Sequence, residues 1–127
     1  MTDEFIEQAR ARAEHAYAPF SKFRVGVVVV ADDGTTYEGA NVENSAYGTS
    51  MCAEATAIGN AVSQGVRKID TVVVACIDAG EPGYPCGNCR QLMIEFGVER
   101  VVVDGPNGAI EHSLEELIPH GFRLESD

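Results

Sequence analysis

The first half of the chain changes from a helical repeat of apolar residues to a strand-like one. Apolar residues recur at helical spacing from Asp3 to Tyr17, and acidic residues lie in the first turn, which predicts an amphipathic helix. The Val-rich run from Phe23 to Ala31 is typical of a buried strand. The turn residues Asp32-Asp33-Gly34 then predict a hairpin leading to a second strand from Thr35 to Glu43.

The second half alternates between helices and strands. The predicted elements are a helix from Ser50 to Val62, a strand from Thr71 to Ile77, a helix from Cys86 to about Phe96, strands over Glu99–Asp104 and Ala109–His112, and a short helix starting at Ser113. The connection Asp104–Gly108 is too short for a parallel crossover, so the last strand should return antiparallel. This order predicts an α/β chain, a mixed sheet covered by helices, in one domain over residues 1–127.

Charge argues against one class of partner. The chain carries 20 acidic and nine basic residues, a formal net charge of −11 at pH 7. Its two lysines, Lys22 and Lys68, form no basic cluster. Proteins that bind nucleic acid concentrate lysine and arginine to neutralise phosphates. We therefore expect a small, uncharged substrate and no nucleic-acid partner.

No segment of the sequence indicates a membrane. The stretch Met1–Glu4 is acidic and is not followed by the apolar stretch of a signal peptide. No run approaches the ~20 apolar residues that a transmembrane helix requires. We expect a cytoplasmic location, where thiols stay reduced. For the four cysteines, that compartment favours metal binding or catalysis over disulfides.

Two short fragments, Cys52-Ala53-Glu54 and Pro85-Cys86-Gly87-Asn88-Cys89, carry the candidate chemistry. Both lie where a helix is predicted to start, so helix dipoles favour thiolates there. Three thiolate ligands leave the fourth position of a tetrahedral zinc open, as a catalytic site requires. Glu54 is two residues from Cys52 and faces another direction on the helix, which places its carboxylate beside the metal and not on it.

A thiol redox protein is the alternative from a different class. The segment Cys86-Gly87-Asn88-Cys89 also resembles a thioredoxin-type Cys-x-x-Cys at a helix start. That interpretation leaves Cys52 and Glu54 without a role, and the matching strand–helix order does not precede the motif. Cys76 lies in the apolar run Thr71–Ile77, so we predict that it belongs to the core and not to the metal site.

Together with Ala16–Gly26 and Gly39–Gly48, the two cysteine fragments resemble the zinc-dependent cytidine deaminases, in particular the small homotetrameric enzymes that act on free nucleosides. The resemblance extends over roughly residues 5 to 122. It implies a three-layer α/β/α fold with a mixed five-stranded sheet whose last strand is antiparallel. It also implies one Zn²⁺ per chain, held by Cys52, Cys86 and Cys89.

The implied reaction belongs to pyrimidine salvage. It is the hydrolytic deamination of cytidine and deoxycytidine to uridine and deoxyuridine plus ammonia. Zinc-bound hydroxide attacks C4 of the base, with Glu54 as the catalytic proton shuttle. A deaminase of nucleoside antibiotics, of the blasticidin S type, shares the zinc motif and remains an alternative. The pair Asn41-x-Glu43 favours an ordinary nucleoside.

The resemblance also assigns residues that bind the substrate. Asn41 and Glu43 lie two apart at the predicted strand end, so they share one face. The resemblance places both side chains on the ribose 3′-hydroxyl and the Phe23 ring against the pyrimidine. The backbone N–H of Ala53 is expected to orient the base carbonyl. Tyr47 belongs to a segment that meets a neighbouring subunit's site in the implied homotetramer.

The chain departs from the pattern immediately after Glu54. Many relatives carry an arginine at that position, where it tempers the negative charge of the thiolates, and here the residue is Ala55. The two helix dipoles, or Arg90 next to Cys89, are candidates for that role.

Overall fold

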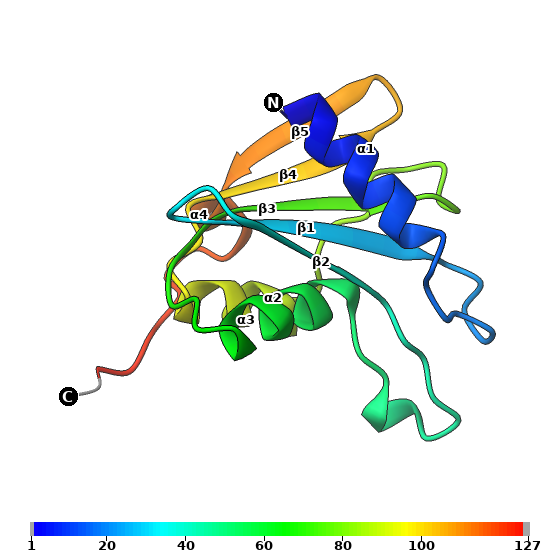
Figure 1. Cartoon of the computed structure of the whole chain (residues 1–127), viewed down its shortest axis with the longest axis horizontal. Coiled ribbons are helices and arrows are strands. Elements are labelled where there is room, and N and C mark those ends of the chain that lie inside the picture. The colour runs from blue at the N-terminus through cyan, green and yellow to red at the C-terminus, as the bar shows by residue number, and fades with distance from the viewer. Residues whose placement is uncertain (1, 126–127) are drawn as a thin grey trace.

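A five-stranded mixed sheet forms the centre of the computed structural model, which describes residues 2–125 (Figure 1). Its strands are β1 (Val25–Ala31), β2 (Thr36–Ala40), β3 (Ile69–Cys76), β4 (Arg100–Gly105) and β5 (Gly108–Ser113), in the spatial order β2-β1-β3-β4-β5. β1 is antiparallel to β2 and β3, β3 and β4 are parallel, and β5 is antiparallel to β4. The mixed sheet with an antiparallel last strand is confirmed.

Helices cover both faces of this sheet, which gives three layers (Figure 1). They are α1 (Thr2–Ala13), α2 (Ala53–Ser63), α3 (Gly87–Glu95) and α4 (Leu114–Leu117), with a 3-10 turn, η1, at Tyr47–Thr49. α1 lies on one face, whereas α2 and α3 lie on the other. α4 begins at the predicted cap, Ser113, which forms a capping box with Glu116. Within residues 2–125, no helix combines the length and apolar character needed to span a bilayer.

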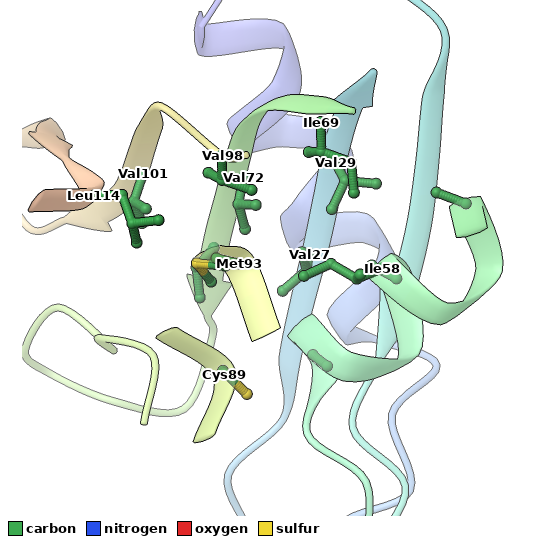
Figure 2. Packing of buried hydrophobic residues seen from close by; sticks show 14 of the residues in the cluster. Val27, Val29, Ile58, Ile69, Val72, Cys89, Met93, Val98, Val101 and Leu114 are labelled. Atoms are coloured by element: carbon green, nitrogen blue, oxygen red, sulfur yellow. The ribbon is translucent and has the colours of Figure 1, made fainter. Parts of the chain in front are cut away.

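Alternate residues of each central strand fill two cores. Val27 and Val29 of β1 point toward α2 and α3 and join the larger cluster (Figure 2). Val28, between them, belongs to the smaller cluster under α1. Burial on both faces explains why β1 and β3 are continuous runs of valine and not alternating strands.

Two glycines allow the helices to approach the β1–β2 hairpin. A Cβ at Gly26 would lie 1.9 Å from the carbonyl oxygen of Ala9 in α1. A Cβ at Gly39 would lie 2.4 Å from the backbone nitrogen of Ala57 in α2. These contacts are shorter than any side chain tolerates, so both positions require glycine. The close approach at Gly39 fixes α2, and with it the N-cap Cys52, against β2.

Two elements end earlier than the sequence pattern predicts. α1 ends at Ala13 and not at Tyr17, because the Tyr17 N–H donates to the Asn41 carbonyl and Pro19 disfavours helix just before it. β2 ends at Ala40, and the predicted continuation to Glu43 becomes isolated bridges from Val42 to Tyr17 and to Met51. These bridges bring the segments 14–24 and 41–52 side by side.

Candidate active site

The starts of α2 and α3 meet below the sheet and bring three thiols together. Cys52 is the N-cap of α2, Cys86 is the N-cap of α3, and Cys89 lies in the first turn of α3. Their Sγ atoms all lie within 4.8 Å of one another. Figure 2 shows Cys89 on α3 with its sulfur turned toward α2. Cys76, half-buried at the end of β3, is not part of this group.

The group fits zinc. A tetrahedral site with Zn–S bonds of about 2.3 Å places its sulfur atoms about 3.8 Å apart, a spacing that three thiols within 4.8 Å reach with small adjustments. Cys89 is buried, whereas Cys52 and Cys86 are exposed. The exposed side therefore leaves room for a fourth ligand, as a catalytic metal site requires.

The electrostatics of the thiols also call for a cation. Burial, followed by the nearby charge of Cys86, raises the pKa of the Cys52 thiol. Burial and the Glu54 carboxylate raise the pKa of Cys89. Burial alone would also raise the pKa of Cys86, but hydrogen bonds from the Cys89 backbone N–H and thiol lower it overall. A divalent cation between the sulfurs would compensate three thiolates in this setting.

Glu54, the second residue of α2, lies beside the thiols. Only 5% of its surface is exposed, and burial raises the pKa of its carboxyl. Its negative charge contributes to the raised pKa of the Cys89 thiol, and its place in the first turn of α2, two residues after Cys52, puts it at the same helix start. A carboxyl whose pKa is raised can accept a proton and return it within one reaction cycle.

Glu43 is held by the turn that precedes β1. Its Oε1 accepts hydrogen bonds from the backbone N–H groups of Phe20 at 2.9 Å and Ser21 at 3.1 Å. Its Oε2 accepts a hydrogen bond from the Ser21 hydroxyl. The hydrogen bond from the Ser21 hydroxyl has the largest effect on the pKa of the Glu43 carboxyl, which it lowers. The carboxylate is thus ionised and fixed in direction.

Asn41 is engaged with the start of β1. Its side-chain Nδ2 donates to the Phe23 carbonyl at 2.8 Å, and its Oδ1 accepts the Val25 N–H at 2.8 Å. The amide therefore fixes the backbone on both sides of Arg24. One further hydrogen on Nδ2 and one lone pair on Oδ1 remain for a ligand.

An open cavity of about 450 Å³ lies over Glu43, and it is lined by Phe20, Ser21, Glu43, Tyr47 and Ser50. The Tyr47 ring packs edge-on against Phe20 with centroids 5.7 Å apart. Phe20, Ser21 and Ser50 were not among the residues predicted from sequence. They occupy turns and loops, where no repeat of apolar residues marks a role.

The remaining two predicted residues differ in exposure. Phe23 is 52% exposed, just before β1. Ala53 is buried and is the first residue of α2, so its backbone N–H is one of those without a partner inside the helix. Tyr47, at 74%, is more exposed than either.

Arg90, one candidate for the role of the arginine that many relatives carry at position 55, makes its hydrogen bonds to backbone carbonyls. The Arg90 Nε donates to the Pro85 carbonyl at 2.8 Å, and its Nη1 donates to the Leu117 carbonyl at 2.6 Å. The side chain therefore ties the peptide just before Cys86 to the end of α4. Its visible role is to hold the start of α3 in place.

Comparison with known proteins identifies the family. The model of the cytidine and deoxycytidylate deaminase zinc-binding region matches residues 1–104, which include the three clustered cysteines and Glu54. The chain belongs to this deaminase family. The family is defined by a zinc-binding region, and the group formed by Cys52, Cys86 and Cys89 is suited to hold that zinc.

Individual deaminases match along nearly their whole length. The cytidine deaminase of Sporosarcina psychrophila is 42% identical over 126 residues, which cover 97% of this chain and 92% of that protein. The crystal structure of cytidine deaminase from Burkholderia pseudomallei superimposes with a TM-score of 0.88 at 38% identity, covering 96% of this chain and 99% of that chain. The crystal structure of cytidine deaminase from Mycobacterium tuberculosis superimposes with a TM-score of 0.83 at 33% identity, covering 96% of this chain and 97% of that chain.

Proposed function

We propose that this chain is a zinc-dependent cytidine deaminase of pyrimidine salvage, which hydrolyses cytidine and deoxycytidine to uridine and deoxyuridine with release of ammonia. The observation that carries the proposal is the group of three thiols within 4.8 Å of one another at two helix starts, with a buried carboxyl beside it. Relatives and solved structures of the same length, named cytidine deaminases, support the same reaction.

Three cysteines would hold the metal, and Glu54 would move the protons. Zinc bound by Cys52, Cys86 and Cys89 supplies Lewis-acid chemistry that makes a water acidic enough to attack at neutral pH. The Glu54 carboxylate takes the proton of the attacking water and delivers it to N3 of the base. The same carboxylate then takes the proton of the new C4 hydroxyl and delivers it to the C4 amino group, so that the C4–N bond breaks, ammonia leaves and the C4 carbonyl forms. Burial of Glu54 keeps bulk water away from these transfers.

The rest of the site would bind the nucleoside. Phe23 offers an exposed ring to the pyrimidine, and the N–H of Ala53, which has no partner inside α2, orients the base carbonyl. Asn41 and Glu43 bind the ribose 3′-hydroxyl through the hydrogen-bonding capacity that their contacts within the chain leave unused.

We further propose a homotetramer in which neighbouring subunits share sites. The high exposure of Phe23, and of Tyr47 at the edge of the cavity over Glu43, supports this, because large aromatic side chains at that level of exposure suit a protein interface. The four free cysteines suit the reducing cytoplasm. One sheet with helices packed on both faces supports a single domain over residues 1–127.

Ultraviolet absorbance tests the reaction. Purified zinc-loaded protein is mixed separately with cytidine, deoxycytidine and blasticidin S, and the loss of absorbance that accompanies deamination is followed. We expect turnover of the first two and none of the third. Turnover of blasticidin S alone would replace the proposed substrate. Reduction of insulin by metal-free protein, with no deamination, would instead support a redox role for Cys86 and Cys89.

A further inference from the structure

The hydroxyl of Ser21 lies between two side chains that the proposed function assigns to the substrate. Its Oγ donates to Oε2 of Glu43, the proposed sugar ligand. The same Oγ accepts the backbone N–H of Phe23, the proposed base contact, at 3.1 Å. A single hydroxyl thus joins the sugar side and the base side of the site.

The backbone around Ser21 is held in an unusual conformation. Lys22 has a φ of 66°, in the left-handed region that non-glycine residues rarely adopt, and its N–H donates to the Ala18 carbonyl at 3.1 Å. Two backbone N–H groups of the same turn, from Phe20 and Ser21, point at the Glu43 carboxylate. The turn and the carboxylate therefore fix each other.

The contacts to the Ser21 turn leave the Glu43 carboxylate with room for one more hydrogen bond. A carboxylate offers about four lone-pair positions, two on each oxygen. Oε1 receives two N–H groups, and Oε2 receives the Ser21 hydroxyl. One position on Oε2 remains for a substrate hydroxyl, and its direction is set by the Ser21 contact. The same residues line the cavity over the site, so this position is open to a ligand.

We propose that Ser21 is a positioning residue that sets the strength with which the enzyme recognises the ribose 3′-hydroxyl. This inference rests on the proposed function. Without the Ser21 hydroxyl, Oε2 of Glu43 loses the contact that directs it, and the Phe23 N–H loses its acceptor. Zinc binding and proton transfer do not involve this hydroxyl, so the change should appear in KM and not in kcat.

The experiment compares two nucleosides on a set of Ser21 variants. Steady-state kinetics are measured with cytidine and with 3′-deoxycytidine for the parent, Ser21→Ala, Ser21→Thr and the control Ser63→Ala, which changes an exposed serine in α2. For Ser21→Ala we expect KM for cytidine to rise about tenfold, the size of one well-placed hydrogen bond, with kcat within about twofold. The preference for cytidine over 3′-deoxycytidine should fall by the same factor. Ser21→Thr, which keeps the hydroxyl, should restore both values.

The outcomes separate this inference from the proposed function. A parent protein that deaminates neither nucleoside would overturn the function itself. A parent that prefers cytidine, with the same preference in Ser21→Ala, would overturn only the role of Ser21, as would equal losses on both nucleosides. Zinc content per chain reports folding. If Ser21→Ala loses zinc, Ser21→Cys keeps a side chain of similar size with a weaker donor, and it must then show an intermediate loss of preference.

Discussion

The two sides of the candidate site are built differently. The side that holds the metal, here the metal pole, consists of Cys52, Glu54, Cys86 and Cys89. All four lie at the caps or in the first turns of α2 and α3, and Glu54 and Cys89 are buried. The side that would hold the nucleoside, here the recognition rim, consists of Phe23, Asn41, Glu43 and Tyr47. These residues lie outside the strands and α-helices, and Phe23 and Tyr47 are more than half exposed.

The contrast indicates how each side keeps its geometry. At the metal pole, helix backbone and core packing fix the side chains, since the helices that carry them pack on the sheet through Gly39 and Met93. At the recognition rim, hydrogen bonds from side chain to backbone do this work, as at Asn41 and Glu43. Substitutions at the pole should therefore abolish function, whereas substitutions at the rim should change affinity in graded steps.

Loss of a ligand should have the largest effect. Cys89→Ala removes one of three sulfurs, so we expect zinc content to fall well below one per chain and turnover to become undetectable. Cys76→Ala is the matched control because its thiol lies outside the group, and it should keep zinc. Metal analysis of the purified variants gives the answer. Full zinc in Cys89→Ala, or loss of zinc in Cys76→Ala, would refute the ligand assignment.

Removal of Glu54, the proposed proton carrier, should have the next largest effect. Glu54→Gln keeps the shape of the side chain, so fold and zinc should persist while kcat falls by at least ~10²–10⁴-fold, the usual contribution of general acid–base catalysis. Glu115→Gln is the control, because Glu115 is likewise the second residue of a helix but is exposed, in α4. It should leave kcat unchanged. Near-normal turnover in Glu54→Gln would show that another group carries the proton.

The metal pole and the recognition rim also differ in how far the sequence predicts them. The meeting of Cys86 and Cys89 follows from helical spacing alone, and the structure confirms that they lie together with Cys52. The strands and the order of helices were predicted as well, because valine runs and turn residues carry strong local signals.

The predictions from sequence were wrong where tertiary contacts outweighed the local preference for helix or strand. Tyr17 was predicted in the first helix, but it pairs with Val42 instead. Glu43 was predicted at the end of a strand, but it lies in a loop and binds the Ser21 turn. No local pattern singles out Ser21 within the matching segment Ala16–Gly26, because its contact is with a carboxylate 22 positions away and the positive φ lies at the next residue. Roles at the recognition rim depend on such long-range contacts.

Loss of Glu43, the proposed sugar ligand, tests the graded behaviour of the recognition rim. Glu43→Ala should lower kcat/KM for cytidine by about 10–100-fold, as expected for a hydrogen bond to a charged group, with a much smaller loss for free cytosine. Zinc content should not change. Since Ala also releases the Phe20–Ser21 turn, Glu43→Gln serves as the second variant, because its amide oxygen can still accept the two backbone N–H groups. Equal losses on both substrates in Glu43→Gln would make Glu43 structural.

The smallest expected effect lies at the edge of the metal pole, at Arg90. Its guanidinium holds the Pro85 carbonyl, one peptide before Cys86, and also the Leu117 carbonyl. Arg90→Met should release zinc to a chelator a few-fold faster, less than the ~10–100-fold typical for residues bonded directly to a metal ligand. Arg90→Lys, which keeps a cationic donor group but not the planar fork that reaches two carbonyls, should fall between Met and the parent. The control is Arg67→Met, because Arg67 also donates to two backbone carbonyls but at the far end of α2. If Arg90→Met and Arg67→Met released zinc at the same rate, helix bracing in general, and not the position of Cys86, would govern metal retention.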